Sequence, residues 1–429
     1  MILLKKAVKK KKKKLGKKGS FFSRIRNAFK AFLGNDDEKA SFSMLEVIVI
    51  ILVSILFGVL IGYIITYSRD NAVLPKSKVS EIVNTYHNIV NRYYEDIDED
   101  KLADAAIKGM VDSLEDPYSD FLREEDANSF NQSIDGSFVG IGAVIQFEEE
   151  YNKIIEIYDG SPSYKAGLKV GDIILQVDGK DLHNVYGDEV VKLIQGKIGT
   201  DVTILIRRGE EEKEFTITRD TIELHVVSSD IIESDGKNIG YIKIDSFSAN
   251  SYKQFVKQLK KVEKKSVDYL ILDVRDNLGG HLLQTKQILS LFFPRRTVLY
   301  RIESKNHKKK VYSSEKSDIT YPIAVLINGG SASASELFAS CFQENYEKSI
   351  LVGKTTYGKG MVQKSQDLSS GTTIKYTTEK WLTSKGKWIE GVGVSPDFEV
   401  EQSEEYYESP SHETDSVLQE AIQKLKESN

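Results

Sequence analysis

Serine side chains gather in one short stretch, INGGSASASEL at residues 327–337. The apolar, β-branched run before it, 322–327, predicts a buried strand of the parallel type. Residues 336–342 predict a helix with one apolar face. The serines therefore lie on a strand-to-helix turn, where backbone N–H groups without partners can stabilise an anion. A serine in that place can attack a carbonyl carbon and leave the resulting oxyanion to a neighbouring N–H group.

The same residues also fit a purely structural role. Ser333 and Glu336 match the S-x-x-E capping box, in which a hydroxyl and a carboxylate satisfy the free N–H groups of a helix start. The turn alone favours that cap. A catalytic role needs a proton acceptor elsewhere in the chain.

Lys359 is the candidate acceptor. It stands between Gly358 and Gly360, on a loop that follows a second apolar strand at 350–353. A lysine has a reference pKa of ~10.4, and a general base at neutral pH needs a pKa of roughly 7–8. Burial lowers the pKa of a lysine, so we expect a desolvated site that is free of nearby carboxylates. The structural alternative is an ordinary solvated surface lysine.

Taken together, the segments SASASE (331–336) and YGKGMVQ (357–363) resemble those of the carboxyl-terminal processing (tail-specific) serine peptidase family, S41-type. Tyr357 stands where that family usually has phenylalanine. The resemblance implies a Ser-Lys dyad in which Ser333 is the nucleophile, Lys359 is the general base and Gln363 orients the lysine. None of the six histidines stands in a setting typical of a serine-protease triad.

A glycine turn completes the implied site. The buried strand predicted at 268–275 runs into the sequence DNLGG, and a helix is predicted at 281–293. In the resembling family this turn lies beside the nucleophile, and the resemblance implies two oxyanion donors. One is the N–H group of Ala334, and the other belongs to Gly279 or Gly280, between which the sequence does not decide.

Residues 128–221 change to short strands and glycine turns, with a strand predicted at 201–208. The string AGLKVGDIILQVDG (166–179) resembles a PDZ domain. In that comparison Phe138, Gly140, Ile141 and Gly142 form a loop whose bare N–H groups receive a peptide C-terminus. A helix predicted at 188–194 forms the other wall of the groove. A tight turn without a ligand is the structural alternative for these glycines.

The N-terminal part predicts a membrane anchor. Residues 1–43 form a lysine-rich tail, and residues 47–66 form an uninterrupted apolar or neutral run, so we expect a transmembrane helix at 44–67. The positive-inside rule places the tail in the cytoplasm, near anionic membrane lipid, and the rest of the chain outside. A cleaved signal peptide is the alternative, but no A-x-A-like site follows the run.

Charge and composition restrict the partners. Residues 1–43 hold 14 Lys and Arg against 3 Asp and Glu, so the formal net charge of −5 leaves −16 for the rest of the chain. A domain this acidic is a poor binder of nucleic acid. The single cysteine, Cys341, excludes an intramolecular disulfide framework and suggests plain packing. The sequence indicates no cofactor and no metal constellation such as H-E-x-x-H.

Strands that alternate with helices predict an α/β fold, which the resemblance extends to a crotonase-like protease core with an inserted PDZ domain. The expected organisation is a basic tail at 1–43, the membrane helix at 44–67, a helical segment at 76–127, the PDZ domain at 128–221, the protease core at 222–400 and an acidic tail at 401–429. That tail is expected to be solvated as far as a short helix at 415–426.

The predicted function is therefore that of a membrane-anchored serine endopeptidase that recognises protein or peptide substrates by their free C-termini. The helical segment can mediate self-association in the resembling family, so a homodimer is one option. A catalytically silent PDZ adaptor is the alternative from another class. Acyl-CoA chemistry on a crotonase-like fold is a third hypothesis, but it gives the PDZ insertion no task.

Overall fold

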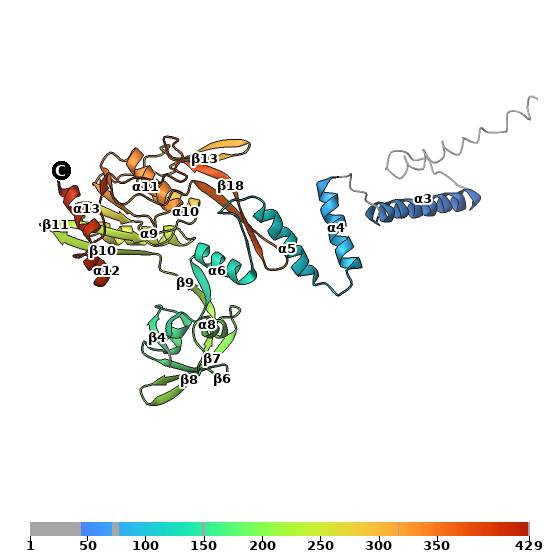
Figure 1. Ribbon diagram of the computed structural model, residues 1–429, viewed down its shortest axis with the longest axis horizontal. Coiled ribbons are helices and arrows are strands. Elements are labelled where there is room, and N and C mark those ends of the chain that lie inside the picture. The colour runs from blue at the N-terminus through green and yellow to red at the C-terminus, as the bar shows by residue number, and fades with distance from the viewer. Residues whose placement is uncertain (1–43, 71–76, 148–150, 316, 428–429) are drawn as a thin grey trace, which may run out of the picture. The chain divides into compact units, whose positions relative to one another are not determined.

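The computed structural model describes residues 44–70, 77–147, 151–315 and 317–427. The chain divides into two units, Met1–Glu99 and Asp100–Asn429. In the first unit, α3 covers Met44–Asp70 and α4 covers Lys78–Arg92 (Figure 1). α4 begins where the side chain of Ser77 accepts a hydrogen bond from the N–H group of Ser80, which is a regular N-cap.

Among the helices that the structure describes, none combines the length and the apolar character that crossing a bilayer requires. The predicted transmembrane segment at 44–67 is therefore without support from the structure. The predicted basic tail at 1–43 lies outside the described residues.

The second unit is built on a six-stranded sheet with the strand order β10-β11-β12-β15-β16-β19. β10 pairs antiparallel with β11, and the other neighbours are parallel. Every residue of β12 and β15 is buried, as expected for parallel strands that are covered on both faces. The strands are β10 (Val227–Ser234), β11 (Lys237–Ile244), β12 (Tyr269–Asp273), β15 (Ile323–Ile327), β16 (Ser349–Gly353) and β19 (Phe398–Glu399).

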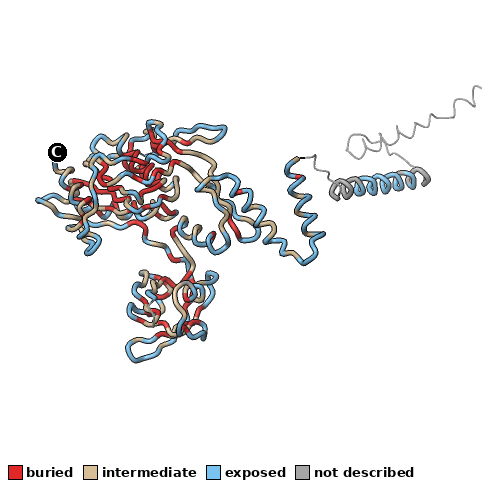
Figure 2. The backbone as a smooth tube through the Cα atoms, viewed as in Figure 1, coloured by how far each residue is buried: buried red, intermediate tan, exposed pale blue. Residues whose placement is uncertain are grey.

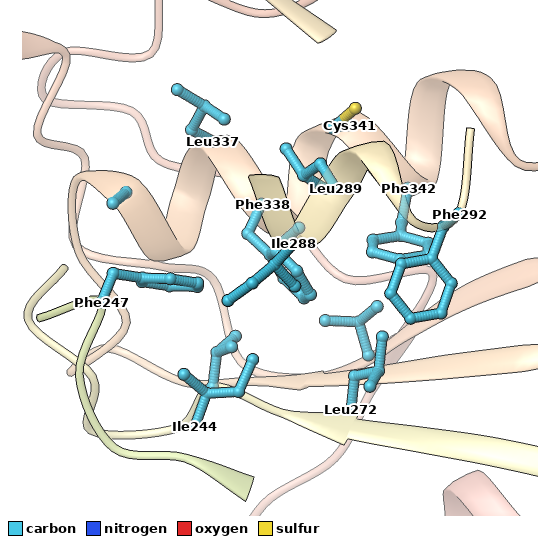
Figure 3. Packing of buried hydrophobic residues seen from close by; sticks show 14 of the residues in the cluster. Ile244, Phe247, Leu272, Ile288, Leu289, Phe292, Leu337, Phe338, Cys341 and Phe342 are labelled. Carbon is cyan, nitrogen blue, oxygen red and sulfur yellow. The ribbon is translucent and has the colours of Figure 1, made fainter. Parts of the chain in front are cut away.

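Helices pack on both faces of this sheet. Alternate residues of β12 separate accordingly: Leu270 and Leu272 join the core with Phe338 and Phe342, while Ile271 joins a second core with Leu418. Figure 3 shows the first core, in which Phe247, Phe292 and Phe338 lie between helix and sheet. The α/β class predicted from the sequence is confirmed. The helices are α9 (Ser251–Glu263), α10 (Leu282–Ser290) and α11 (Ala334–Asn345) on the first core and α13 (Ser416–Glu427) on the second.

An antiparallel sheet lies beside the helices and carries the lysine loop. Its strand order is β1-β18-β13-β14, and β17 also pairs with β18. The pairing of β17 with β18 sets Gln363 opposite Thr377. The elements are α5 (Glu99–Asp112), β1 (Asp120–Leu122), α6 (Glu124–Asp135), β13 (Val298–Ser304), β14 (His307–Tyr312), β17 (Met361–Asp367) and β18 (Thr373–Leu382).

Residues 143–218 form a small β-rich domain with a hydrophobic core of its own, visible as a separate set of buried residues in Figure 2. The strand predicted at 201–208 and the helix predicted at 188–194 are confirmed residue for residue. The elements are β3 (Ala143–Phe147), β4 (Asn152–Ile157), α7 (Pro162–Ala166), β5 (Ile173–Val177), β6 (Lys180–Asp181), α8 (Asp188–Ile194), β7 (Asp201–Arg208) and β8 (Glu211–Thr218).

Two antiparallel strands, β2 (Ser137–Gly140) and β9 (Asp220–Glu223), lead into and out of this domain. The side chain of Asn250 donates hydrogen bonds to the carbonyl oxygens of Gly136 (2.8 Å) and Leu224 (3.2 Å). The side-chain amide of Asn250 therefore contacts the chain both where it enters the small domain and where it leaves it.

The C-terminal tail follows the prediction. The helix expected at 415–426 is confirmed as α13, and a short helix, α12 (Glu404–Glu408), precedes it. Residues 401–414, which were expected to be solvated, include no buried residue, whereas Asp415 beside the helix is buried and forms a 2.7 Å ion pair with Arg275. Arg275 also pairs with Asp273 at 2.6 Å, so the tail is attached to the end of β12.

Candidate active site

The three serines of the turn between β15 and α11 have different environments. Ser331 is buried and donates to the carbonyl oxygen of Val274 at 2.7 Å, and Ser335 is buried and donates to that of Asn277 at 2.8 Å. Their hydroxyl groups are therefore used to hold the turn. Ser333 is only half-buried, and it lines a cavity of about 750 Å³. Of these three serines it is the one placed to meet a substrate.

The backbone of Ser333 is strained. Its φ of 56° and ψ of −110° lie in a region that residues with a Cβ atom rarely adopt. Ser333 and Glu336 stand in the arrangement of a capping box at the start of α11. Within it the Glu336 carboxylate accepts from the Ser333 N–H group at 2.7 Å.

Glu336 connects the serine turn to the lysine loop. Its side chain is completely buried, and its Oε2 atom accepts from the N–H groups of Ser333 (2.7 Å) and Lys359 (2.8 Å). Its Oε1 atom accepts from the Thr356 hydroxyl and the Gly358 N–H group, both at 2.6 Å. Burial raises the pKa of the Glu336 carboxyl, and these four hydrogen bonds oppose that rise. One carboxylate oxygen therefore fixes the spacing between the backbones of Ser333 and Lys359.

Further contacts hold the lysine loop. The indole N–H group of Trp381 donates to the carbonyl oxygen of Lys359 at 2.9 Å, and the Gly360 N–H group donates to Glu390 at 2.7 Å. The Lys359 ammonium lies 4.8 Å from the centre of the Tyr118 ring. The hydroxyl group of Tyr118 donates to Glu390 at 2.7 Å. The loop is thus fixed on both sides of Lys359.

The pKa of Lys359 is lowered, as the sequence analysis required of a general base. Burial is the main cause, and repulsion from Lys375 adds to it. The expectation that no carboxylate lies near is wrong, because Glu390, Asp116 and Glu336 all act to raise this pKa. Each of the three accepts hydrogen bonds from other groups, which spreads its negative charge over those donors.

The glycine turn packs directly on the serine turn. A Cβ atom on Gly279 would lie 3.0 Å from both the Ala334 nitrogen and the Ser333 Cβ atom. The Gly279 N–H group already donates to the side chain of Asn277 at 2.8 Å. Within the described part of the chain, the N–H groups of Gly280 and Ala334 have no acceptor. Of the two glycines that the sequence left open, Gly280 therefore has the N–H group available for an oxyanion.

Gln363 lines the same cavity as Ser333 and Lys359. Its side-chain amide donates to the Thr377 hydroxyl at 3.1 Å. Over the described residues, no hydrogen bond joins the Ser333 hydroxyl to the Lys359 ammonium. Ser333, Lys359, Gln363, Gly279 and Gly280 all line this one cavity.

The residues predicted to bind a peptide C-terminus line a cavity of their own. Phe138, Gly140, Ile141 and Gly142 together line a cavity of about 110 Å³, and Val191 of α8 forms part of its other wall. The carbonyl oxygens of Ile141 and Gly142 accept hydrogen bonds from the segment around α7. Their N–H groups find no acceptor among the residues that are described, so they are available to a carboxylate.

Three residues of the active-site region were missed by the sequence analysis. Glu336 was recognised only as a capping residue, although the S-x-x-E pattern was the signal that marked it. Tyr118 follows a loop proline, and Lys375 is the third residue of β18; neither belongs to a motif. Their proximity to Lys359 results from the pairing of β18 with β1 and β17, which no local pattern indicates.

The fold and these two sites define an α/β serine hydrolase that carries a small peptide-binding domain. Comparison with family models agrees: residues 238–400 match peptidase family S41, residues 153–208 match a PDZ domain, and residues 65–126 match the N-terminal domain of the activating protease CtpB.

The chain is 39% identical to the carboxy-terminal processing protease CtpA of Bacillus subtilis over 327 aligned residues. This alignment covers 76% of this chain and 69% of that protein. A probable CtpA-like serine protease of Staphylococcus epidermidis is 36% identical, over 76% of this chain and 66% of its own length. The chain thus spans about two thirds of the length of these relatives. The solved photosystem II D1 C-terminal processing protease aligns with a TM-score of 0.46 and 25% identity, over 76% of this chain and 87% of that one.

The chain therefore belongs to peptidase family S41 and is a carboxy-terminal processing serine protease with a PDZ domain. The family predicted from the SASASE and YGKGMVQ segments is confirmed. These relatives are proteases, which does not favour the hypothesis of a silent adaptor.

Proposed function

We propose that this protein is a membrane-anchored serine endopeptidase with a crotonase-like core at 222–400, and that it cleaves extracytoplasmic proteins with a Ser333–Lys359 dyad. The observation that carries the proposal is the shared carboxylate of Glu336. It binds the backbone N–H groups of both residues, and both residues line the same cavity.

The reaction follows from these positions. Lys359, as a neutral amine, removes the proton of the Ser333 hydroxyl while the Ser333 oxygen attacks the carbonyl carbon of the substrate. The N–H groups of Ala334 and Gly280 stabilise the oxyanion that forms. The tetrahedral intermediate collapses to an acyl-enzyme when the Lys359 ammonium protonates the leaving amine. Water, deprotonated by Lys359, then hydrolyses the ester and restores the Ser333 hydroxyl.

This sequence requires that the Ser333 hydroxyl and the Lys359 amine come within hydrogen-bonding distance when substrate is bound. Catalytic hydrogen bonds are often long before substrate binds and shorten in the complex. We propose that Gln363 leaves Thr377 in that step and orients the amine of Lys359. A Gln363→Glu variant adds a charge that would hold the lysine protonated, so its cleavage rate at pH 7 should fall well below that of wild type.

The dyad is tested with the full chain purified in detergent and an unstructured protein substrate. Ser333→Ala and Lys359→Ala should both lose cleavage, whereas Ser331→Ala should mainly lower the melting temperature. A serine-directed sulfonyl fluoride should label Ser333 in the wild-type chain. Wild-type cleavage by either dyad variant would refute the assignment.

We propose that the groove at Phe138, Gly140, Ile141 and Gly142 receives the C-terminal carboxylate of the substrate, within a PDZ domain at 128–221. The available N–H groups of Ile141 and Gly142 support this role. A short peptide with a free carboxylate should compete with substrate, and the same peptide with a C-terminal amide should not. Equal competition by both peptides would contradict carboxylate capture.

Membrane anchoring and self-association are also proposed. The lysine-rich tail at 1–43 beside the apolar run at 47–66 supports a single-pass anchor with the catalytic part outside. Carbonate-resistant sedimentation of the full chain with membranes tests this. The exposed apolar side chains of Val79 and Ile82 on α4 support a homodimer. Light scattering of the wild type and of Ile82→Glu should show a dimer and a monomer respectively.

A further inference from the structure

Lys375 is one of three lysines that line the active-site cavity, together with Lys359 and Lys364. It is half-buried on β18, and it lines the cavity together with Ser333 and Lys359. Its ammonium lies 5.3 Å from the centre of the Phe130 ring, on α6. In the described ranges of the chain, no carboxylate forms an ion pair with it. A cation without an acidic partner, in an acidic protein, therefore shares the cavity with the proposed catalytic base.

The groups that face Lys359 make this cation important. Three carboxylates from three different segments favour its protonated form: Glu390 from the loop before β19, Asp116 from the loop before β1, and Glu336 from α11. Burial and the positive charge of Lys375 both favour the neutral form of Lys359, and burial has the larger effect. The pKa of Lys359 is lowered as the net result.

Those three carboxylates are needed for other contacts. Glu336 binds the serine turn, and Glu390 binds the N–H group of Gly360 and the hydroxyl of Tyr118. Asp116 accepts from the hydroxyl of Ser119. The site therefore cannot discard its negative charges without losing these contacts, and those of Glu336 and Glu390 hold the lysine loop. A compensating positive charge is the remaining electrostatic means of favouring a neutral amine.

We propose that Lys375 is a positioning residue of the reaction, whose charge keeps Lys359 in the neutral form that removes the Ser333 proton. This inference rests on the proposed Ser333–Lys359 chemistry and adds a tuning residue to it. Lys375 itself exchanges no proton with the substrate and forms no bond to it.

The test is the pH dependence of kcat/KM between pH 5.5 and 10, measured with the full chain in detergent and an unstructured fluorogenic substrate. Lys375→Gln removes the charge, and Lys375→Arg keeps it. Lys309→Gln, at an exposed position of β14 in the same antiparallel sheet, removes the same charge at a site away from the cavity. The rate of Ser333 labelling by a sulfonyl fluoride is measured over the same range. In that reaction the Ser333 oxygen displaces fluoride from sulfur and Lys359 takes up the hydroxyl proton.

In Lys375→Gln, the rise of kcat/KM and of the labelling rate with increasing pH should occur about half to one pH unit higher than in wild type. This is the effect of one unit charge across a partly solvated site. Activity at pH 7 should fall by about three- to tenfold and return to within about twofold of wild type near pH 9.5. The profiles of Lys375→Arg and Lys309→Gln should match the wild-type profile.

Three results would overturn the inference. An unshifted rise with pH in Lys375→Gln would show that the charge does not act on the base. An equal loss at every pH, with normal sulfonyl fluoride labelling, would show that Lys375 binds substrate instead. Loss of the wild-type profile in Lys375→Arg would show that shape, not charge, matters. Lys359→Ala separates the two proposals: wild-type cleavage by that variant would remove the dyad itself.

Discussion

Replacing Glu336 with glutamine tests the structural basis of the site most directly. Glutamine has almost the shape of glutamate but only one acceptor oxygen. That oxygen can still accept from the N–H groups of Ser333 and Lys359. The NH₂ group must then face the Thr356 hydroxyl and the Gly358 N–H group, which now donate to Oε1 at 2.6 Å.

The size of the effect follows from this geometry. The Thr356 hydroxyl can turn and accept from the NH₂ group, but the Gly358 N–H group loses its acceptor, which costs about 1–3 kcal/mol. Hydrogen bonds to a neutral oxygen are also weaker than those to a carboxylate. Part of the loss is offset, because burial already disfavours the charged form of Glu336. The free energy of unfolding should therefore fall by about 2–4 kcal/mol.

Activity should respond differently from stability. Glu336 acts through the backbones of Ser333 and Lys359, so a small change in their spacing should lower kcat by about 10–100-fold. KM should change little, because Glu336 does not line the cavity. Steady-state kinetics on an unstructured substrate and a urea denaturation curve measure the two effects separately.

Glu344 offers a matched control on the same helix. Its carboxylate accepts from the Thr383 and Ser384 hydroxyls and from the Lys385 N–H group, at 2.7–2.9 Å, away from the cavity. Glu344→Gln should lose stability but keep wild-type kcat. If Glu336→Gln also kept wild-type kcat, the idea that this carboxylate sets the distance between the two catalytic backbones would be wrong.

Three further variants or measurements have clear expected results. Gly279→Ala should lower kcat by about 10²-fold, because its methyl group would crowd the oxyanion donor Ala334 at a φ of 106°; wild-type kinetics would contradict the proposed packing. Lys359→Met should abolish cleavage yet raise the melting temperature at pH 7. Because a lysine with a lowered pKa binds fewer protons when folded, that gain should shrink as pH rises towards about 10.5. The thiol of Cys341 is buried and its pKa is raised, so a thiol reagent should modify it only at the rate of unfolding.

The sequence was informative wherever a local pattern decides the outcome. The strand at 201–208 and the helix at 188–194 have the predicted limits, and the helix was expected from the resemblance to a PDZ domain. The two catalytic candidates were found through the resemblance of the SASASE and YGKGMVQ segments to a peptidase family, while strand ends and glycine loops only placed these segments on turns. The choice between Gly279 and Gly280 was out of reach, since it depends on a hydrogen bond from the Gly279 N–H group to the Asn277 side chain that forms only in the folded turn.

Electrostatics was the other limit, because charge proximity is a property of the tertiary structure. The sequence prediction of a lysine base assumed a site without carboxylates. Glu336 nevertheless holds the backbones of Ser333 and Lys359 and at the same time raises the pKa of Lys359. The two demands are compatible only because its charge is spread over four donors, while burial and the charge of Lys375 act on the Lys359 amine itself. A protein that holds a base in place with acidic groups must neutralise their field at the amine. For this reason the residues that tune Lys359 matter as much as those that hold it.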